Sequence, residues 1–407
     1  MKSITINGGR PLEGKITASG SKNAALPILF ATLVAKGVSE IENLPDIGDV
    51  RVAIEILRGM GVSVERGGGV TVIDSTNARY SPPNPFLIGK IRASTYLIGA
   101  CLGRFGVCSV GEYGGCSFSN RPIDLHIDAM RSLGAYSDAE SMLLPLPRAG
   151  EIALRLPSVG ATVNALILAS SIKGESRIKG AAREPHVSAL IDFLVSAGAE
   201  IRAEDDVLTV KGGGLHGGKT RIIGDMIEGF SYLVCGLATH GEVKVDGVDW
   251  DTLLSPLSAL TKLGYKVAVE NGVASVTEGA VQRALAVTAE PYPGFPTDLQ
   301  PIISPLLAIN AGGVIIDKVF SERFGYLEVL KAFGVRSRRI ISGAIIERTG
   351  LFSAEAVAPD LRGGMAAIIT ALAAPGKSVI HSADIVLRGY ERLEEKLTSI
   401  GAQIRTN

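Results

Sequence analysis

The sequence has few cysteines. Its 407 residues include only four, Cys101, Cys108, Cys116 and Cys235. Their spacing matches no metal-ligand motif, so we expect no metal site. A chain of this length can bury a large core without disulfides, which favours a reducing compartment. We therefore expect a cytoplasmic protein.

The sequence also lacks net charge and long apolar runs. Lys+Arg and Asp+Glu number 41 each, so no overall field favours nucleic acid or a membrane surface. The longest apolar run, residues 24–35, contains Pro27 and Thr32 and is shorter than the roughly 18 residues of a membrane span. Residues 1–15 alternate like a strand and contain no signal-peptide core. We expect neither nucleic acid nor membrane as a partner, so local arginines and lysines must hold any bound anion.

Glycine, by contrast, is abundant and regularly placed. Six segments read Leu or Met, three residues, Gly, then a short β-prone run, with glycines spaced 64 to 73 residues apart: Gly61, Gly134, Gly198, Gly264, Gly334 and Gly401. Six interleaved segments end an apolar helical stretch with glycine before an alternating strand, as in "LVAKGVSEIEN" and "LGRFGVCSVGE". Glycine suits the position after a helix because it adopts positive φ without strain.

A fixed period predicts repeated supersecondary units. Six units in one chain suggest an α/β protein of two domains with three repeats each, and a ligand cleft between them. The strand before Gly20 has no preceding helix of its own, so we expect it to complete the sheet of the last repeat. The predicted domains are residues 21–223 and, discontinuously, residues 1–20 with 224–407.

Several polar residues stand where a loop meets an apolar helix. Lys22 and Asn23 begin one helix, whose N-terminus favours an anion, and Arg92 opens another. Cys116 follows the glycines of "YGGC", in a loop suited to a closing lid. Arg121, five residues later, would stabilise a thiolate or a bound anion.

The second half of the chain carries a candidate base and further cations. "PYPGFPTDLQP" presents Thr297 and Asp298 at a helix start. This is an ordinary capping arrangement but also a way to hold a general base. Arg323, Arg362 and Arg388 each precede an apolar helix. With Lys22 and Arg121, these arginines would bind a ligand that carries phosphate and carboxylate groups.

With these residues in place, the chain resembles the UDP-N-acetylglucosamine 1-carboxyvinyltransferase family, the enolpyruvyl transferases of peptidoglycan synthesis. Matching blocks run in order along the whole chain: "GSKNAALP", "GGC" with "RPIDLH", "PSVGAT", "AAREP", "GFPTDLQ", "ERF", "DLR" and "RGYERLEEKL". The resemblance implies two inside-out α/β domains of three repeats each. It also implies the substrates phosphoenolpyruvate and UDP-N-acetylglucosamine, no cofactor, and inactivation by fosfomycin.

The resemblance also implies roles for individual residues. Lys22, Arg121 and Arg388 would contact the phosphate of phosphoenolpyruvate, and Arg362 and Arg388 its carboxylate. Asn23 would hold the intermediate, and Cys116 would be the proton donor that also forms an adduct with phosphoenolpyruvate. The positions expected to contact the UDP-sugar are Arg92, Arg121, Pro122, Ile123, Asp124, Leu125, Ser158, Val159, Gly160, Asp298 and Val319.

The sequence departs from the family pattern at a few positions. Met226 stands where the family usually has arginine, and Leu387 where it usually has aspartate before Arg-Gly-Tyr-Glu. In the cysteine loop, Tyr113 and the pair Phe118 and Ser119 replace the usual residues. These changes leave the chemical set intact.

The sequence also allows two other interpretations of the function. One is an enolpyruvyl transferase with another nucleotide acceptor. The other is a non-catalytic ligand-binding relative, which would be expected to have lost Cys116, Asp298 or one of the arginines, and this chain keeps them all. The shikimate-phosphate branch fits less well because of the Ser-Lys-Asn-Ala-Ala motif and the loop cysteine. The RNA-cyclase relatives of this architecture need a histidine motif that is missing here.

Overall fold

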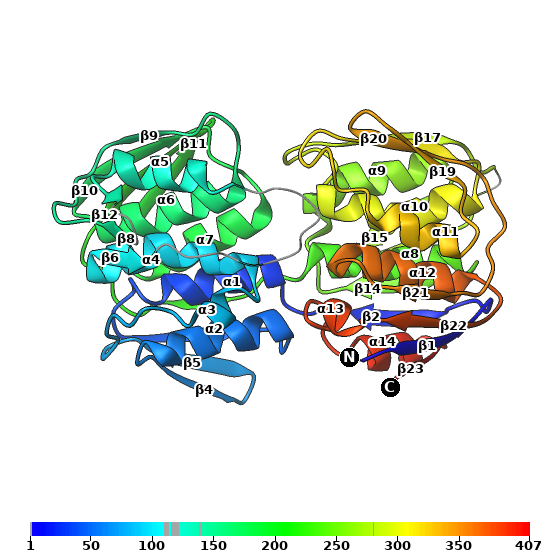
Figure 1. The fold of residues 1–407 in the computed structure, drawn as a ribbon, viewed down its shortest axis with the longest axis horizontal. Coiled ribbons are helices and arrows are strands. Elements are labelled where there is room, and N and C mark those ends of the chain that lie inside the picture. The colour runs from blue at the N-terminus through cyan, green and yellow to red at the C-terminus, as the bar shows by residue number, and fades with distance from the viewer. Residues whose placement is uncertain (1, 110–113, 115–121, 138–140, 280) are drawn as a thin grey trace. The chain divides into compact units, whose positions relative to one another are not determined.

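The computed structural model describes residues 2–109, 114, 122–137, 141–279 and 281–407. The described residues form two compact units. The terminal unit contains both chain ends, with the described residues of 2–19 and 224–407, and the central unit contains the described residues that lie between them in the sequence. Both units contain helices and sheets, with the helices on the inside, and each is described by itself (Figure 1).

The central unit consists of three helix–strand–helix–strand–strand repeats. The first is α1 (Lys22–Ala31), β3 (Val38–Glu42), α2 (Gly48–Gly59), β4 (Ser63–Gly67) and β5 (Val70–Asp74). The second is α4 (Leu97–Phe105), β6 (Val107–Ser109), α5 (Asp124–Ser132), β7 (Tyr136–Ser137) and β8 (Ser141–Leu143). The third is α6 (Val159–Ser171), β10 (Gly174–Lys179), α7 (Pro185–Ser196), β11 (Glu200–Glu204) and β12 (Val207–Gly212). Connecting elements are α3 (Pro85–Ile88), η1 (Arg92–Tyr96), β9 (Glu151–Ala153) and β13 (Lys219–Arg221).

The terminal unit repeats the same order. Its repeats are α8 (Met226–Ala238), β14 (Val243–Asp246), α9 (Leu254–Leu263), β15 (Lys266–Glu270) and β16 (Val273–Thr277), then α10 (Gln300–Ile309), β18 (Gly313–Asp317), α11 (Tyr326–Ala332), β19 (Ser337–Ile340) and β20 (Gly343–Ile346). The last is α12 (Leu361–Ala373), β22 (Gly376–His381), α14 (Leu393–Ser399), β23 (Gln403–Thr406) and β1 (Ile4–Gly8). Connecting elements are β2 (Gly14–Thr17), η2 (Trp250–Leu253), β17 (Leu285–Ala289), η3 (Thr297–Leu299), β21 (Glu355–Val357) and α13 (Asp384–Leu387).

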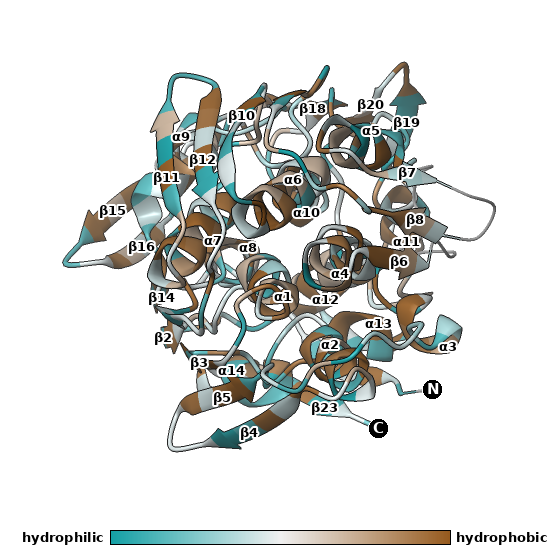
Figure 2. Ribbon diagram, turned by 90° about the vertical axis from the view of Figure 1, so that its left-hand side faces the viewer, coloured by the Kyte–Doolittle hydropathy of each residue, from teal (hydrophilic) through white to brown (hydrophobic). Residues whose placement is uncertain are grey.

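Three helices form the interior of each unit: α1, α4 and α6 in the central unit, and α8, α10 and α12 in the terminal unit. Every residue from Leu361 to Leu372 of α12 is buried, as is every residue from Ala161 to Ser170 of α6. A helix that is apolar all round must lie inside. Hydrophilic residues concentrate on outer strands such as β4, β11 and β19 (Figure 2). No described helix is long and apolar enough to cross a membrane.

The sheets follow one plan. In most of them, the first strand of a repeat lies between an added parallel strand and the last strand of the repeat, as in the order β17-β18-β20-β19. In the last repeat, β1 pairs antiparallel with both β22 and β23. The prediction that the first strand completes the sheet of the last repeat is therefore confirmed.

The glycine pattern is confirmed in the backbone. All six glycines of the first kind have positive φ, between 80° at Gly61 and 106° at Gly264. In the second pattern the "LATHGEVKV" segment differs, because His240 adopts the positive φ of 57° in place of Gly241. Gly241 is needed for space instead, since a Cβ there would lie 2.1 Å from the carbonyl oxygen of Leu12.

A buried ion pair fixes the end of the first segment of the terminal unit. Lys396 Nζ lies 2.6 Å from Glu228 Oε1 and 2.6 Å from Ser19 Oγ. The amide of Ser19 donates to the other oxygen of Glu228 at 2.9 Å. Ser19 is the last residue of this unit before the chain enters the central unit at Gly20.

Candidate active site

In the terminal unit, Asp298 is held between two buried arginines. Its Oδ1 accepts a hydrogen bond from Arg323 Nη1 at 2.6 Å. Its Oδ2 accepts from Arg362 Nε at 3.1 Å and from Nη2 at 3.0 Å. The arginine side chains are only 5% and 3% exposed, whereas that of Asp298 is 26% exposed. The sequence placed these three residues at separate junctions, and the structure brings them together.

The backbone around Asp298 is fixed by buried polar contacts. Asp298 lies in η3, directly before α10. Thr297 Oγ1 donates to Asp317 Oδ2 at 2.6 Å, and Gln300 Nε2 donates to the carbonyl oxygen of Arg323 at 2.7 Å. The other oxygen of Asp317 accepts from the amide of Val319 at 2.8 Å. The predicted residue Val319 is therefore tied to the same network.

Arg362 stands at the N-terminal end of α12. Asp360 caps this helix, accepting hydrogen bonds from the amides of Arg362 and Gly363 at 2.9 and 3.0 Å. Burial acts to lower the pKa of Arg362, but the negative charges of Asp298 and Asp225 and the neighbouring Tyr390 hydroxyl together outweigh it and raise the pKa above its ordinary value. Arg362 is therefore charged at all physiological pH values. Arg323 and Arg362 thus place two positive charges against the single carboxylate of Asp298.

Arg388 follows α13 and is half-buried. A Cβ on the next residue, Gly389, would lie 2.7 Å from the side chain of Leu361. The Tyr390 ring lies 5.6 Å from the Arg362 guanidinium. The segment that carries Arg388 therefore packs against the start of α12. Two of the departures from the family pattern, Met226 and Leu387, are partly buried against the apolar core of this unit. The others, Tyr113, Phe118 and Ser119, lie outside the described residues.

In the central unit, Lys22 and Asn23 are the first two residues of α1. Lys22 Nζ lies 3.4 Å from Asp49 Oδ2, and both side chains are largely buried. Ser21 occupies the N-cap position, but its side chain makes no capping hydrogen bond. Its carbonyl oxygen instead accepts from the amides of Ala24 and Ala25.

Two predicted segments of the central unit lie at the starts of neighbouring helices. Ile123, Asp124 and Leu125 lead into α5, with Pro122 just before them, and Asp124 forms an ion pair with Arg155. Ser158, Val159 and Gly160 lead into α6, where Ser158 Oγ accepts from the amide of Ala161 at 3.3 Å. Helices α5 and α6 pack against each other.

His126 and Asn164 join these segments and were missed from the sequence. A Cβ on Gly160 would lie 2.6 Å from His126 Cε1, so the ring lies directly against that glycine. Asn164 Nδ2 lies 2.8 Å from His126 Nδ1. Burial and the positive charge of Arg92 lower the pKa of His126 to about 4. Only their positions in the sequence could have indicated them, because His126 directly follows "RPIDL" and Asn164 lies one helical turn after Gly160.

Cys116 and Arg121 lie outside the described residues. The other three cysteines are free thiols and are buried. Among the residues that the structure describes, no group of three or more His, Cys, Asp or Glu side chains is placed to hold a metal ion.

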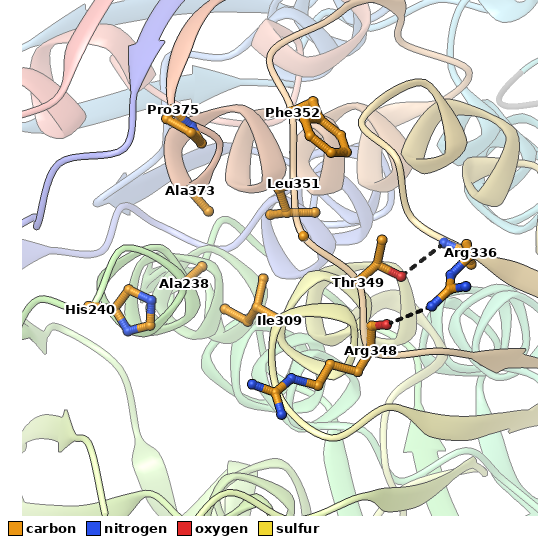
Figure 3. A pocket seen from close by; sticks show the side chains of 11 residues that line it. Ala238, His240, Ile309, Arg336, Arg348, Thr349, Leu351, Phe352, Ala373 and Pro375 are labelled. Atoms are coloured by element: carbon orange, nitrogen blue, oxygen red, sulfur yellow. Dashed lines mark hydrogen bonds between the residues drawn. The ribbon is translucent and has the colours of Figure 1, made fainter.

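A cavity of about 600 Å³ lies elsewhere in the terminal unit. Its lining includes Ala238, Ile309 and Ala373, the last residues of α8, α10 and α12, with Arg348 and His240 beside them (Figure 3). Asp298 and Arg362 stand at the opposite, N-terminal ends of α10 and α12. The cavity shares no residue with the predicted site.

Comparisons with known proteins place the chain in a family. The model of the family described as EPSP synthase (3-phosphoshikimate 1-carboxyvinyltransferase) matches residues 6–397. A UDP-N-acetylglucosamine 1-carboxyvinyltransferase of Halothermothrix orenii is 37% identical over 100% of this chain and 99% of its own. One from Caldanaerobacter subterraneus subsp. tengcongensis is 38% identical over 99% of both chains.

Solved structures agree on the fold. The enolpyruvyl transferase NikO from Streptomyces tendae matches with a TM-score of 0.89 and 23% identity, covering 100% of this chain and 99% of that one. EPSP synthase from Acinetobacter baumannii matches with a TM-score of 0.76 and 19% identity over the full length of both chains. The expected architecture of inside-out α/β domains built from repeats is confirmed. Together with the full-length relatives, these matches show that the chain belongs to the EPSP synthase family of carboxyvinyltransferases, and within it to the UDP-N-acetylglucosamine 1-carboxyvinyltransferases.

Proposed function

We propose that this protein transfers the enolpyruvyl group of phosphoenolpyruvate to the 3-hydroxyl of UDP-N-acetylglucosamine and releases phosphate, a step of peptidoglycan precursor synthesis. The observation that carries the proposal is full-length identity of 37% and 38% with relatives of that name. The carboxylate held by two arginines at Asp298 supports it, since the reaction needs both a base and fixed positive charge. The free thiols fit a cytoplasmic enzyme.

The proposed chemistry is addition followed by elimination. The sugar hydroxyl attacks C2 of phosphoenolpyruvate while C3 gains a proton. The resulting tetrahedral ketal then loses phosphate from C2 and a proton from C3 to a base, which forms the double bond of the enol ether. An alcohol is a poor nucleophile, so a base must take its proton. The side chain of Asp298 is 26% exposed, whereas those of the two arginines that hold it are buried, so its carboxylate is the group we propose to take this proton.

Further residues have proposed roles that follow the sequence expectations. Cys116 supplies the proton to C3. Lys22, Arg121, Arg362 and Arg388 bind the charged groups of phosphoenolpyruvate and stabilise departing phosphate. Asn23 holds the intermediate. The residues proposed to bind the sugar nucleotide are Arg92, Pro122, Ile123, Asp124, Leu125, Ser158, Val159, Gly160 and Val319.

The direct test is phosphate release from phosphoenolpyruvate with purified protein and UDP-N-acetylglucosamine, with product identified by mass spectrometry. Parallel reactions contain UMP or shikimate 3-phosphate instead. We expect turnover only with the UDP-sugar. If only UMP supported turnover, the proposed acceptor would be wrong. If phosphate were released with none of the three acceptors, the proposed function would be rejected.

Replacing Arg388 by alanine should weaken phosphoenolpyruvate binding by roughly tenfold or more, because a hydrogen bond to a charged group is worth about 1.5–3 kcal/mol. Binding of UDP-N-acetylglucosamine should change much less. The measurement is a separate titration of each ligand, with Arg405→Ala, at an exposed site on β23, as the control. Equal weakening of both ligands would contradict this role.

Brief treatment of the native protein with N-ethylmaleimide should modify Cys116 before the other thiols. Cys101, Cys108 and Cys235 are fully buried. The hydrogen bond with Cys108, together with burial, raises the pKa of the Cys101 thiol, and burial raises that of Cys235. Peptide mapping by mass spectrometry gives the order, and the urea-unfolded chain should label at all four positions.

Inactivation by fosfomycin should disappear in Cys116→Ser. A variant as sensitive to fosfomycin as the native protein would remove Cys116 from the mechanism.

A further inference from the structure

The side-chain amide of Asn164 has a fixed orientation. Asn164 lies on α6 and is fully buried. Its Oδ1 accepts a hydrogen bond from the amide of Gly99 at 2.7 Å. A backbone N–H can only donate, so the oxygen must face Gly99 and Nδ2 must face the other way. Nδ2 lies 3.1 Å from the carbonyl oxygen of Thr95 and 3.3 Å from that of Gly160.

This orientation determines where His126 carries its proton. Nδ2 of Asn164 lies 2.8 Å from Nδ1 of His126. Because the amide nitrogen can only donate, Nδ1 must be the acceptor and carries no proton. With a pKa lowered to about 4 by burial and by the charge of Arg92, the ring is neutral at pH 7. A neutral imidazole without a proton on Nδ1 carries it on Nε2.

The protonated nitrogen lies at the first turn of α6. A Cβ on Gly160 would lie 2.7 Å from His126 Nε2. His126 is only 6% exposed, and its ring contacts Asn164 through Nδ1. The first turn of a helix already favours an anion through its unpaired amides and its dipole. The Nε2–H group adds a donor at that place.

The charges around this ring are few. Helix α6 contains no charged residue. Arg92 in η1 supplies a positive charge, and Glu151 of β9 is exposed and paired with Lys179. On α5 itself, Asp124 pairs with Arg155, and Asp128 pairs with Arg131. Asn164 is therefore the contact that selects the tautomer.

We infer that Asn164 is a positioning residue that holds His126 neutral, with its proton on Nε2, so that the ring donates to the diphosphate of a nucleotide sugar bound at the start of α6. The inference rests on the proposed function for the identity of this ligand, and the tautomer itself is independent of it. A ring protonated on Nδ1 instead would turn a lone pair toward the anion. The contact with Asn164 therefore determines whether the His126 ring attracts or repels the diphosphate.

The first experiment measures the tautomer without substrate. Two-bond ¹H–¹⁵N correlation spectra of ¹⁵N-histidine-labelled protein distinguish the two nitrogens, and the chain has only five histidines. The signal lost in His126→Gln assigns His126. We expect the Nε2–H tautomer, unchanged between pH 5.5 and pH 8. An Nδ1–H tautomer, or titration of the ring within this range, would overturn the inference.

The second experiment inverts the tautomer. In Asn164→Asp, one oxygen still accepts from the Gly99 amide, but the other must accept from His126, so the proton moves to Nδ1. The carboxylate also raises the pKa of the ring, by about 1–3 units. At pH 8, where the ring is neutral, the affinity of Asn164→Asp for UDP-N-acetylglucosamine should be lower than that of the native protein by roughly tenfold or more. The affinity should recover as the pH falls and Nε2 is protonated. The native protein should show no such recovery.

Calorimetric titrations with UDP-N-acetylglucosamine and with phosphoenolpyruvate give the readout, and thermal unfolding controls for stability. Phosphoenolpyruvate binding should change less than about threefold, and a flat pH profile in Asn164→Asp would refute the inference. If Asn164→Asp does not fold, two variants of His126 replace it. His126→Gln should still bind UDP-N-acetylglucosamine, because its amide can donate from near the position of Nε2, whereas His126→Leu should lose this binding. Equal binding of the UDP-sugar by these two variants would also refute the inference. Native protein that shows the expected tautomer but binds no UDP-sugar would reject the proposed function alone.

Gly160→Ala gives an independent check, because the new Cβ would collide with the ring at 2.6 Å and displace it. Its matched control is Gly59→Ala at the end of α2, where a Cβ would meet no atom within 4 Å. Sugar-nucleotide binding should fall in Gly160→Ala and stay unchanged in Gly59→Ala. Unchanged binding in Gly160→Ala would contradict a donor at this position.

Discussion

Replacing Asp298 by asparagine should lower kcat for enolpyruvyl transfer by roughly 10²- to 10⁴-fold, the usual contribution of a positioned general base. An amide of the same shape cannot accept the hydroxyl proton. The measurement is steady-state phosphate release at saturating concentrations of both substrates. A variant that keeps kcat within about tenfold of the native protein would falsify the assignment of Asp298 as the base.

Two controls separate chemistry from structure in this experiment. Asp360 is a nearby carboxylate whose oxygen caps α12, and asparagine caps helices about as well as aspartate. Asp360→Asn should therefore retain nearly full turnover. Removing the charge of Asp298 also leaves Arg323 and Arg362 buried without it, so thermal unfolding must be measured alongside, and the assay run well below the melting temperature.

Replacing Lys396 by methionine should lower the free energy of unfolding by about 3–5 kcal/mol, the usual effect of removing one partner of a buried ion pair. Glu228 is 2% exposed, and Lys396 Nζ lies 2.6 Å from its Oε1. Burial raises the pKa of Glu228 despite the nearby lysine, so the carboxylate depends on this cation for its charge. Urea unfolding followed by circular dichroism gives the value.

An exposed ion pair supplies the matched control for Lys396. Lys211 and Glu200 lie 2.8 Å apart on neighbouring strands, with side chains 59% and 63% exposed, and such pairs contribute about 0–1 kcal/mol. Lys211→Met should therefore be nearly neutral. The double variant Lys396→Met with Glu228→Gln should cost less than the sum of its single changes, since neither charge is then left alone. Strict additivity, or a loss below about 1 kcal/mol for Lys396→Met, would show that the pair does not stabilise the fold.

Local sequence patterns determined the repeats of this protein. The glycines after each helix were visible in the sequence because positive φ is a property of one residue and its neighbours. The inner helices were visible as apolar stretches for the same reason. Asp298 and Arg362 could be singled out because each stands at a loop-to-helix junction.

Contacts between distant residues were decided only by the tertiary structure. Asp298 and Arg362 are 64 residues apart, and His126 and Asn164 are 38 apart on different helices. Nothing in the periodicity of either segment specifies its partner. His126 could not be singled out from the sequence because its significance comes from Gly160, Asn164 and Arg92, which only packing brings to it.

The pairing of the connecting strands was decided in the same way. β2 precedes α1 but pairs in parallel with β14, which follows α8. β13 precedes α8 but pairs in parallel with β3, which follows α1. The repeats of both units have the same order of helices and strands along the chain. The sequence pattern therefore determines that the sheet of a repeat gains one parallel strand. Which strand is added depends on packing between segments some 200 residues apart, because side-chain alternation records only which face of a strand is buried and not the strand beside it.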